Sequence, residues 1–185
     1  MKITLMRHGK PEFELSGRVS ASELSGIAKS YDMSGIVDSP PKESLNLVGR
    51  HNIIVSSDLP RSRQSTASLG VSEVHSADAL FRETSIPHFN NGSLKLPMSS
   101  WLIILRCMWF CGYAQNGEAF LAAKARAKEA AQFLITLAKE FNSVLLVGHG
   151  FINYFIAKEL LSENWVGPSR PGKRYWEYGV YSSLP

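Results

Sequence analysis

Cysteine is scarce in this 185-residue sequence, in which only Cys107 and Cys111 occur. A disulfide framework needs more cysteines, and this pair has no histidine or cysteine partners at the spacing of a zinc site. Because the two thiols lie four residues apart in an apolar stretch, we expect them to be small buried side chains on one helix face. The low cysteine content predicts a reducing, cytoplasmic location.

Long apolar runs and long runs of one charge are also missing. The most apolar segment, 101–113, carries Arg106 and is shorter than the ~20 residues of a membrane-spanning helix, so it predicts a buried or lid helix and no membrane partner. Met1 and Lys2 lead directly into an apolar run, without the features of a signal peptide. The formal net charge of +4 comes without a basic block, which favours an anionic substrate over nucleic acid and gives no indication of oligomeric state.

The rest of the composition is that of an ordinary globular domain, with 44% hydrophobic and 19% charged residues. Apolar runs and turn residues predict strands at 2–6, 52–56 and 143–147, a short strand at 73–76, and an edge strand in the aromatic tail around 175–178. Helical patterns occupy 21–33, 60–69, 101–113, 118–141 and 151–162, and 84–100 is expected to be loop. This alternation predicts one domain over 1–185, a three-layer α/β/α sandwich with a mostly parallel central sheet.

Two histidines directly follow predicted strands, and each has glycine beside it. Arg7-His8-Gly9 follows the first strand, and Gly148-His149-Gly150 follows the late one. The strand at 52–56 leads to Arg61. Ligands of open α/β sheets bind beyond the carboxyl ends of the parallel strands. Two imidazoles and two guanidiniums at these turns suit the binding of a phosphoryl group and its attack by histidine, although a structural histidine or a solvated arginine fits each position taken alone.

Five ordered motifs then resemble the histidine phosphatase superfamily, in its phosphoglycerate mutase-like branch that includes small phosphatases. They are Arg7-His8-Gly9, Ser57-Asp58-Leu59-Pro60-Arg61, Glu83, Gly117-Glu118 and Gly148-His149-Gly150. The resemblance implies a phosphoglycerate mutase-like fold and a metal-independent phosphatase without cofactor. It makes His8 the nucleophile that becomes phosphohistidine, and it makes Arg7, Arg61 and His149 the ligands of the phosphoryl oxygens. The implied substrate is a small phosphorylated metabolite or a phosphoprotein, and the product is inorganic phosphate.

The leaving alkoxide needs a proton, for which a carboxylic acid near the phosphate is the usual source. In the superfamily's other branch this acid follows the second histidine, where this chain has Phe151. The resemblance therefore points to Glu83 as the catalytic acid. A glutamate salt-bridged to the neighbouring Arg82 is the alternative interpretation, and Asp78 is the reserve candidate.

The middle of the chain departs from the family pattern. Segment 84–116 lacks the family's usual substrate-contacting stretch, and Glu14 stands where a mutase tends to place asparagine, so it is expected to point outward. Two other functions stay open at this stage. One is a cofactor-dependent phosphoglycerate mutase, and the other is a phosphate-binding or interaction module without turnover that uses 101–113 as a partner surface.

Overall fold

The computed structural model describes residues 1–14 and 17–183, and within them a six-stranded central sheet organises the chain. In spatial order its strands are β4 (Ser76–Asp78), β3 (Ile53–Ser57), β6 (Ser143–Gly148), β1 (Lys2–Arg7), β8 (Tyr178–Ser183) and β7 (Trp165–Val166). The first four run parallel, β8 is antiparallel to β1, and β7 is antiparallel to β8. The prediction of a mostly parallel sheet is confirmed.

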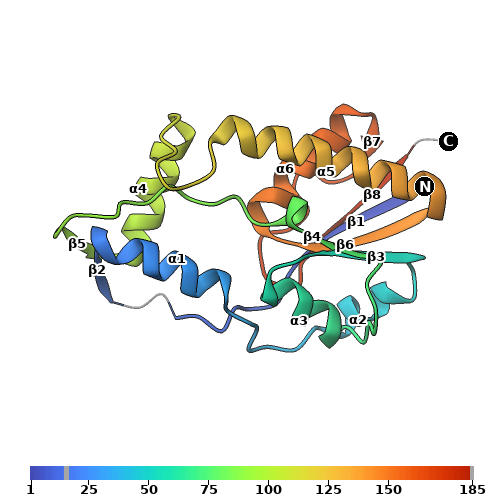
Figure 1. Cartoon of the computed structure of the whole chain (residues 1–185). Helices are drawn as coiled ribbons and strands as arrows, with labels where there is room; N and C mark the ends of the chain where they lie inside the picture. The colour runs from blue at the N-terminus through green and yellow to red at the C-terminus, as the bar shows by residue number, and fades with distance from the viewer. Residues whose placement is uncertain (15–16, 184–185) are drawn as a thin grey trace.

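Helices cover both faces of this sheet, as Figure 1 shows. One face carries α5 (Phe120–Phe141) and α6 (Gly150–Ser162), and the other carries α2 (Lys42–Val48) and α3 (Pro60–Ser68). Strand β6 is buried along its whole length, as expected for a parallel strand with helices on both sides. Helix α5 packs on the sheet through a stripe of small buried side chains, which are Ala123, Ala127, Ala130, Ala131 and Ala138. The result is the predicted three-layer α/β/α sandwich.

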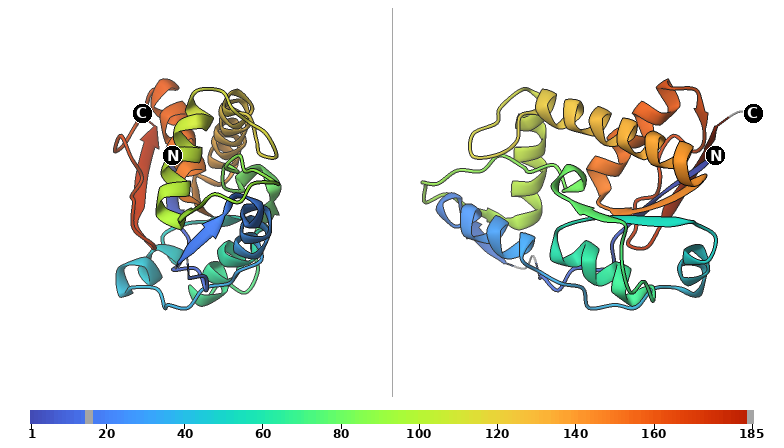
Figure 2. Two further views of the ribbon diagram at one scale, coloured as in Figure 1. Left: turned by 90° about the vertical axis from the view of Figure 1, so that its left-hand side faces the viewer. Right: turned by 45° about the vertical axis from the view of Figure 1, so that its right-hand side comes forward.

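A smaller group of elements, here called the α1–α4 extension, lies at the end of the molecule opposite the N-terminus (Figures 1 and 2). It contains β2 (Arg18–Ser20), the 3₁₀ turn η1 (Ala21–Glu23), α1 (Leu24–Asp32), β5 (Lys95–Pro97) and α4 (Met98–Phe110). Its own apolar cluster consists of Ala21, Leu24, Met98, Trp101 and Leu105. The extension lies beside the sandwich, where it reaches the ends of the strands that carry the candidate site.

Helix α4 is the apolar helix expected at 101–113, beginning three residues earlier. Trp101, Leu105 and Trp109 take its inward face at a spacing of four residues, which leaves the two cysteines on the outside. The prediction of buried cysteines is therefore wrong. No helix in the part of the chain that the structure describes is long and apolar enough to cross a membrane.

Other differences from the predicted elements concern short or non-local pieces. Helix α2 was not predicted because it has only seven residues after the Pro40-Pro41 break. The short strand expected at 73–76 is β4, a few residues later, and it is followed by the 3₁₀ turn η2 (Ala79–Phe81). The tail strand β8 begins at Tyr178 and lies between β1 and β7, so it is not the predicted edge strand.

Candidate active site

The two motif histidines meet at the carboxyl ends of β1 and β6. These strands are parallel neighbours in which Arg7 pairs with Gly148, so His8 and His149 each stand one residue beyond a paired position. The His8 N–H donates to the Gly148 carbonyl at 3.0 Å, and the two ring centroids lie 4.8 Å apart in an edge-to-face arrangement. Both side chains are buried. The sheet thus brings together two imidazoles that are far apart in the chain.

The His8 ring has one nitrogen engaged and one without a hydrogen-bond partner among the described residues. Nδ1 lies 2.6 Å from the Gly9 carbonyl oxygen, which can only accept, so Nδ1 carries the proton and Nε2 is the basic nitrogen. Burial first, and then the charges of Arg61 and Arg7, lower the pKa of His8 from 6.5 to about 3. His8 therefore stays neutral near pH 7, as a nitrogen nucleophile must.

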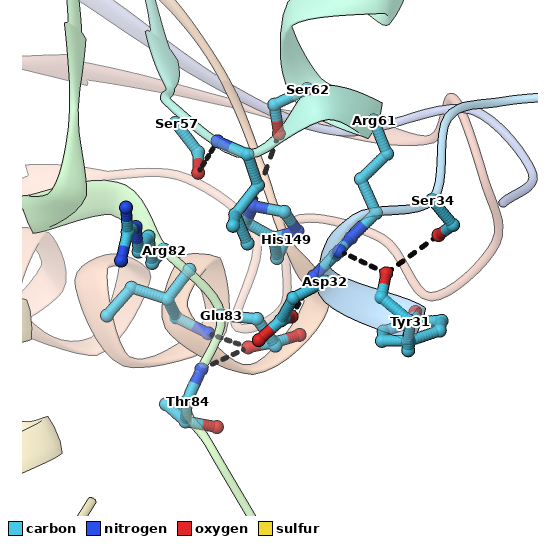
Figure 3. Close-up of polar contacts among 12 residues, drawn as sticks. Tyr31, Asp32, Ser34, Ser57, Arg61, Ser62, Arg82, Glu83, Thr84 and His149 are labelled. Atoms are coloured by element: carbon cyan, nitrogen blue, oxygen red, sulfur yellow. Dashed lines mark hydrogen bonds and ion pairs between the residues drawn. The ribbon is translucent and has the colours of Figure 1, made fainter. Parts of the chain in front are cut away.

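His149 is completely buried at the N-terminal cap position of α6. Its Nε2 lies 3.2 Å from Ser62 Oγ. Figure 3 marks this hydrogen bond with a dashed line. Its Nδ1 is buried and has no partner among residues 1–14 and 17–183. Burial, and after it the proximity of His8 and Arg61, holds the pKa of His149 well below its ordinary value.

Arg61 lies in the first turn of α3, which begins with a proline, and its side chain is fully buried. Its Nη1 donates to the Tyr31 carbonyl at 2.9 Å, and Nη2 lies 3.4 Å from Asp32 Oδ1 (Figure 3). The guanidinium also stacks on the Tyr31 ring, with Cζ 4.5 Å from its centroid. Arg63, two residues further, is exposed. The end of α1 thus orients Arg61 while its buried Nε stays unpaired among the described residues.

Arg7 is held by the loop that precedes β8. Its Nη1 donates to the Lys173 carbonyl, and its Cζ lies 4.4 Å from the centroid of the Tyr175 ring. The same ring lies 5.8 Å from that of His8. Arg7 Nε is buried and has no partner within the described ranges. Each guanidinium of the site is therefore stacked on a tyrosine and keeps an unpaired N–H.

Glu83 caps the start of α6. Its carboxylate accepts N–H groups of Thr84, Phe151 and Ile152 at 2.9 to 3.1 Å. This is a favourable place for negative charge. A Cβ built on Gly150 would lie 3.6 Å from both Arg7 Nε and Glu83 Oε2, so Gly150 has both side chains beside it.

The contacts of Arg82 and Asp78 bear on the two alternatives, which were an ion pair between Arg82 and Glu83 and Asp78 as the acid. Arg82 does not pair with Glu83, because its guanidinium makes bidentate hydrogen bonds of 2.7 and 2.6 Å to Asp58. Asp78 is exposed and accepts the N–H of Leu80 at the start of η2. Glu14, which stands where a mutase tends to place asparagine, is exposed as expected.

Several residues of the site were not predicted. Ser62 touches His149, and Ser65 Oγ accepts the Gly9 N–H at 2.9 Å and so holds the turn after the nucleophile candidate. Asn153 Nδ2 donates to the Met6 carbonyl and ties α6 to β1. One signal in the sequence is a small-hydroxyl face on α3, since Ser62, Ser65 and Thr66 follow Arg61 at helical spacing. The described residues contain no group of three or more histidine, cysteine or acidic side chains that could hold a metal ion.

The sequence matches no family model and no curated protein. The structure, however, is similar to solved ones over nearly its whole length. Rv3214 from Mycobacterium tuberculosis is 19% identical, covers 97% of this chain and 89% of its own, and has a TM-score of 0.63. Mycobacterial glucosyl-3-phosphoglycerate phosphatase Rv2419c is 18% identical over 97% of this chain and 88% of its own, with a TM-score of 0.61. Phosphoserine phosphatase from Entamoeba histolytica is 21% identical over 87% and 80%, with a TM-score of 0.52.

This chain has the histidine phosphatase fold. The resemblance seen in the sequence is confirmed at the level of the fold. In this fold, four side chains that carry nitrogen lie together beyond the carboxyl ends of β1, β3 and β6. They are Arg7, His8, Arg61 and His149. Segment 84–116, which lacks the substrate-contacting stretch expected from the family pattern, supplies α4 and the loop beside Glu83.

Proposed function

We propose that the protein is a metal-independent phosphatase that hydrolyses a small phosphomonoester or a phosphoprotein through a phosphohistidine on His8. The observation that carries this proposal is that three of the four buried nitrogens without partners among the described residues, Arg7 Nε, Arg61 Nε and His149 Nδ1, belong to the site around a neutral His8. Buried polar groups are nearly always paired, so this set fits a site built for an oxyanion.

In the first step, His8 Nε2 attacks phosphorus while the bond between phosphorus and the alcohol oxygen breaks. The guanidiniums of Arg7 and Arg61, with His149, stabilise the charge on the equatorial oxygens. The leaving oxygen takes a proton from the carboxylic acid of Glu83.

In the second step, a water molecule attacks the phosphorus of phosphohistidine and the N–P bond breaks. One proton of the water passes to the Glu83 carboxylate, which restores the acid for the next cycle. Inorganic phosphate leaves, and His8 is again neutral, with Nδ1–H donating to the Gly9 carbonyl.

The similar structures support hydrolysis over transfer to a second substrate. Two of them are phosphatases by name, and Rv2419c has also been solved in complex with VO3, with 19% identity to this chain and a TM-score of 0.58. A vanadium oxyanion is chemically close to a phosphoryl group. We therefore expect vanadate to inhibit this protein competitively.

The test is phosphoenzyme trapping with 4-nitrophenyl phosphate and a ³²P-labelled phosphomonoester. Wild-type protein should turn over in excess EDTA and give an acid-labile, base-stable labelled protein on quenching. His8→Ala should lose both, whereas the matched control His75→Ala, which changes an exposed histidine, should keep both. Undiminished turnover by His8→Ala would overturn the proposal.

A further inference from the structure

Arg126 connects helix α5 to the loop that carries Glu83. Its Nη1 donates hydrogen bonds of 2.8 Å to the carbonyl oxygens of Leu80 and Arg82. The Arg82 carbonyl belongs to the peptide bond between Arg82 and Glu83. One guanidinium nitrogen therefore fixes the backbone directly before the proposed acid.

Glu118 in turn fixes Arg126. Nε and Nη2 of Arg126 donate to the two oxygens of this carboxylate at 2.8 and 2.7 Å, a bidentate arrangement. The two side chains are only 20% and 21% exposed. Glu118 is itself anchored, because its N–H donates to Ser85 Oγ at 3.0 Å and its carbonyl accepts the Trp109 indole N–H at 2.6 Å. Glu118 of the Gly117-Glu118 motif thus holds Arg126 in place, a role that the proposed reaction steps do not include.

Glu83 is consequently held from two sides. The start of α6 binds its carboxylate through the Phe151 and Ile152 N–H groups, and Arg126 binds the carbonyl before its Cα. A proton donor must stay within hydrogen-bond reach of the leaving oxygen, and a shift of about 1 Å can reduce a rate by about 100-fold. We propose that Arg126, held by Glu118, is a positioning residue for Glu83. The inference rests on the proposed function, in which Glu83 protonates the leaving alcohol.

The dependence of the rate on the leaving group provides the test. 4-Nitrophenolate is a weak base and departs without a proton. The phenolate of phenyl phosphate is a stronger base, so its departure depends more on proton donation. Glu83 also takes a proton from water in the second step, which is common to both substrates, so the test uses kcat/KM, which reports the first step. We expect Arg126→Ala to lower kcat/KM by about 10- to 100-fold for phenyl phosphate and by less than about threefold for 4-nitrophenyl phosphate. Glu83→Gln should show the same preference for the better leaving group.

Two further variants separate positioning from general stability. Arg126→Ala in a Glu83→Gln background should lower kcat/KM for phenyl phosphate no further, because the acid that Arg126 positions is already absent. Glu118→Gln, which keeps Arg126 and its carbonyl contacts, should give a smaller effect with the same dependence on the leaving group. Arg82→Ala is the matched control, since it removes the bidentate pair with Asp58 but keeps the carbonyl that Arg126 binds.

An equal fall of kcat/KM for both substrates, additive with Glu83→Gln, would show that Arg126 is only structural and would overturn the inference. If Arg126→Ala does not fold, Glu118→Gln provides the test. An unchanged dependence on the leaving group in Glu118→Gln would then overturn the inference. Failure of the proposed function is separate, because it appears as turnover by His8→Ala or as the absence of a labelled phosphoenzyme.

Discussion

The His8 N–H donates to the carbonyl of Gly148, the residue just before His149. This backbone hydrogen bond between parallel strands holds the two histidines side by side, and their ring centroids lie 4.8 Å apart. Backbone pairing is more rigid than any side-chain contact, which suits a constellation that must be held within fractions of an ångström.

Replacing His149 by Gln should therefore remove an oxyanion contact without moving His8. We expect kcat to fall by about 10²- to 10³-fold, the range seen when one preorganised donor is lost. Steady-state kinetics with 4-nitrophenyl phosphate measure this fall, and the yield of trapped phosphohistidine shows whether the first step is slowed. A change of less than threefold would remove His149 from the proposed mechanism.

Arg61→Lys should weaken phosphate binding strongly although the charge is kept. Lysine is a point charge without the planar fork that binds two phosphate oxygens and stacks on Tyr31. We expect the inhibition constant of vanadate to rise by about 10-fold or more, as for the loss of one charge-assisted hydrogen bond. Arg63→Lys is the matched control, two residues away and exposed, and should leave it unchanged. Equal effects of the two variants would contradict the role of Arg61.

The sequence predicted the sheet and the motifs at its edge because both depend on local patterns. Runs such as Val144-Leu145-Leu146-Val147 identify a buried strand, and the glycine-flanked histidine after it identifies the turn. Tyr31 and Tyr175 could not be predicted in this way. Each stacks on an arginine distant in the chain, and such a contact leaves no periodicity near either partner.

The orientation of Arg82 and Glu83 was unpredictable for a related reason. Neighbours in sequence suggest an ion pair, but an extended backbone at Arg82 sends the two side chains to different partners. Arg82 binds Asp58 and Glu83 binds the start of α6. Likewise, burial of Trp101 and Trp109 decided which face of α4 turns outward, which the even apolar character of 101–113 did not indicate.

Protonation of His8 should link folding to pH. Because burial lowers the pKa of His8 from 6.5 to about 3, the folded state favours the neutral ring, and below pH 6.5 the unfolded state binds more protons. The stability that His8 contributes is therefore complete above pH 6.5 and is lost as the pH falls toward about 3. Relative to His8→Asn, the free energy of unfolding should decrease by about 1.4 kcal/mol per pH unit in this window. Urea unfolding from pH 7 to pH 4.5 measures it, and a constant difference would contradict the burial effect.

Gly9 offers a test of how tightly the turn after the nucleophile is packed. A Cβ at Gly9 would lie 2.4 Å from Cζ2 of Trp176 and 2.7 Å from Asp38 Oδ1. Trp176 is buried and has a left-handed backbone with φ of 64°, so it cannot move aside easily. Gly9→Ala should lower the free energy of unfolding by about 1–3 kcal/mol, the usual cost of overpacking.

The matched control for this substitution is Gly26→Ala. Gly26 lies within α1, where a Cβ meets nothing within 4 Å, so alanine should stabilise the protein by about 0.5–1 kcal/mol through helix propensity alone. Thermal unfolding of both variants gives the stabilities, and phosphoenzyme trapping shows whether the Gly9 carbonyl still orients His8. If Gly9→Ala is as stable and as active as Gly26→Ala, the close contact with Trp176 does not constrain the site.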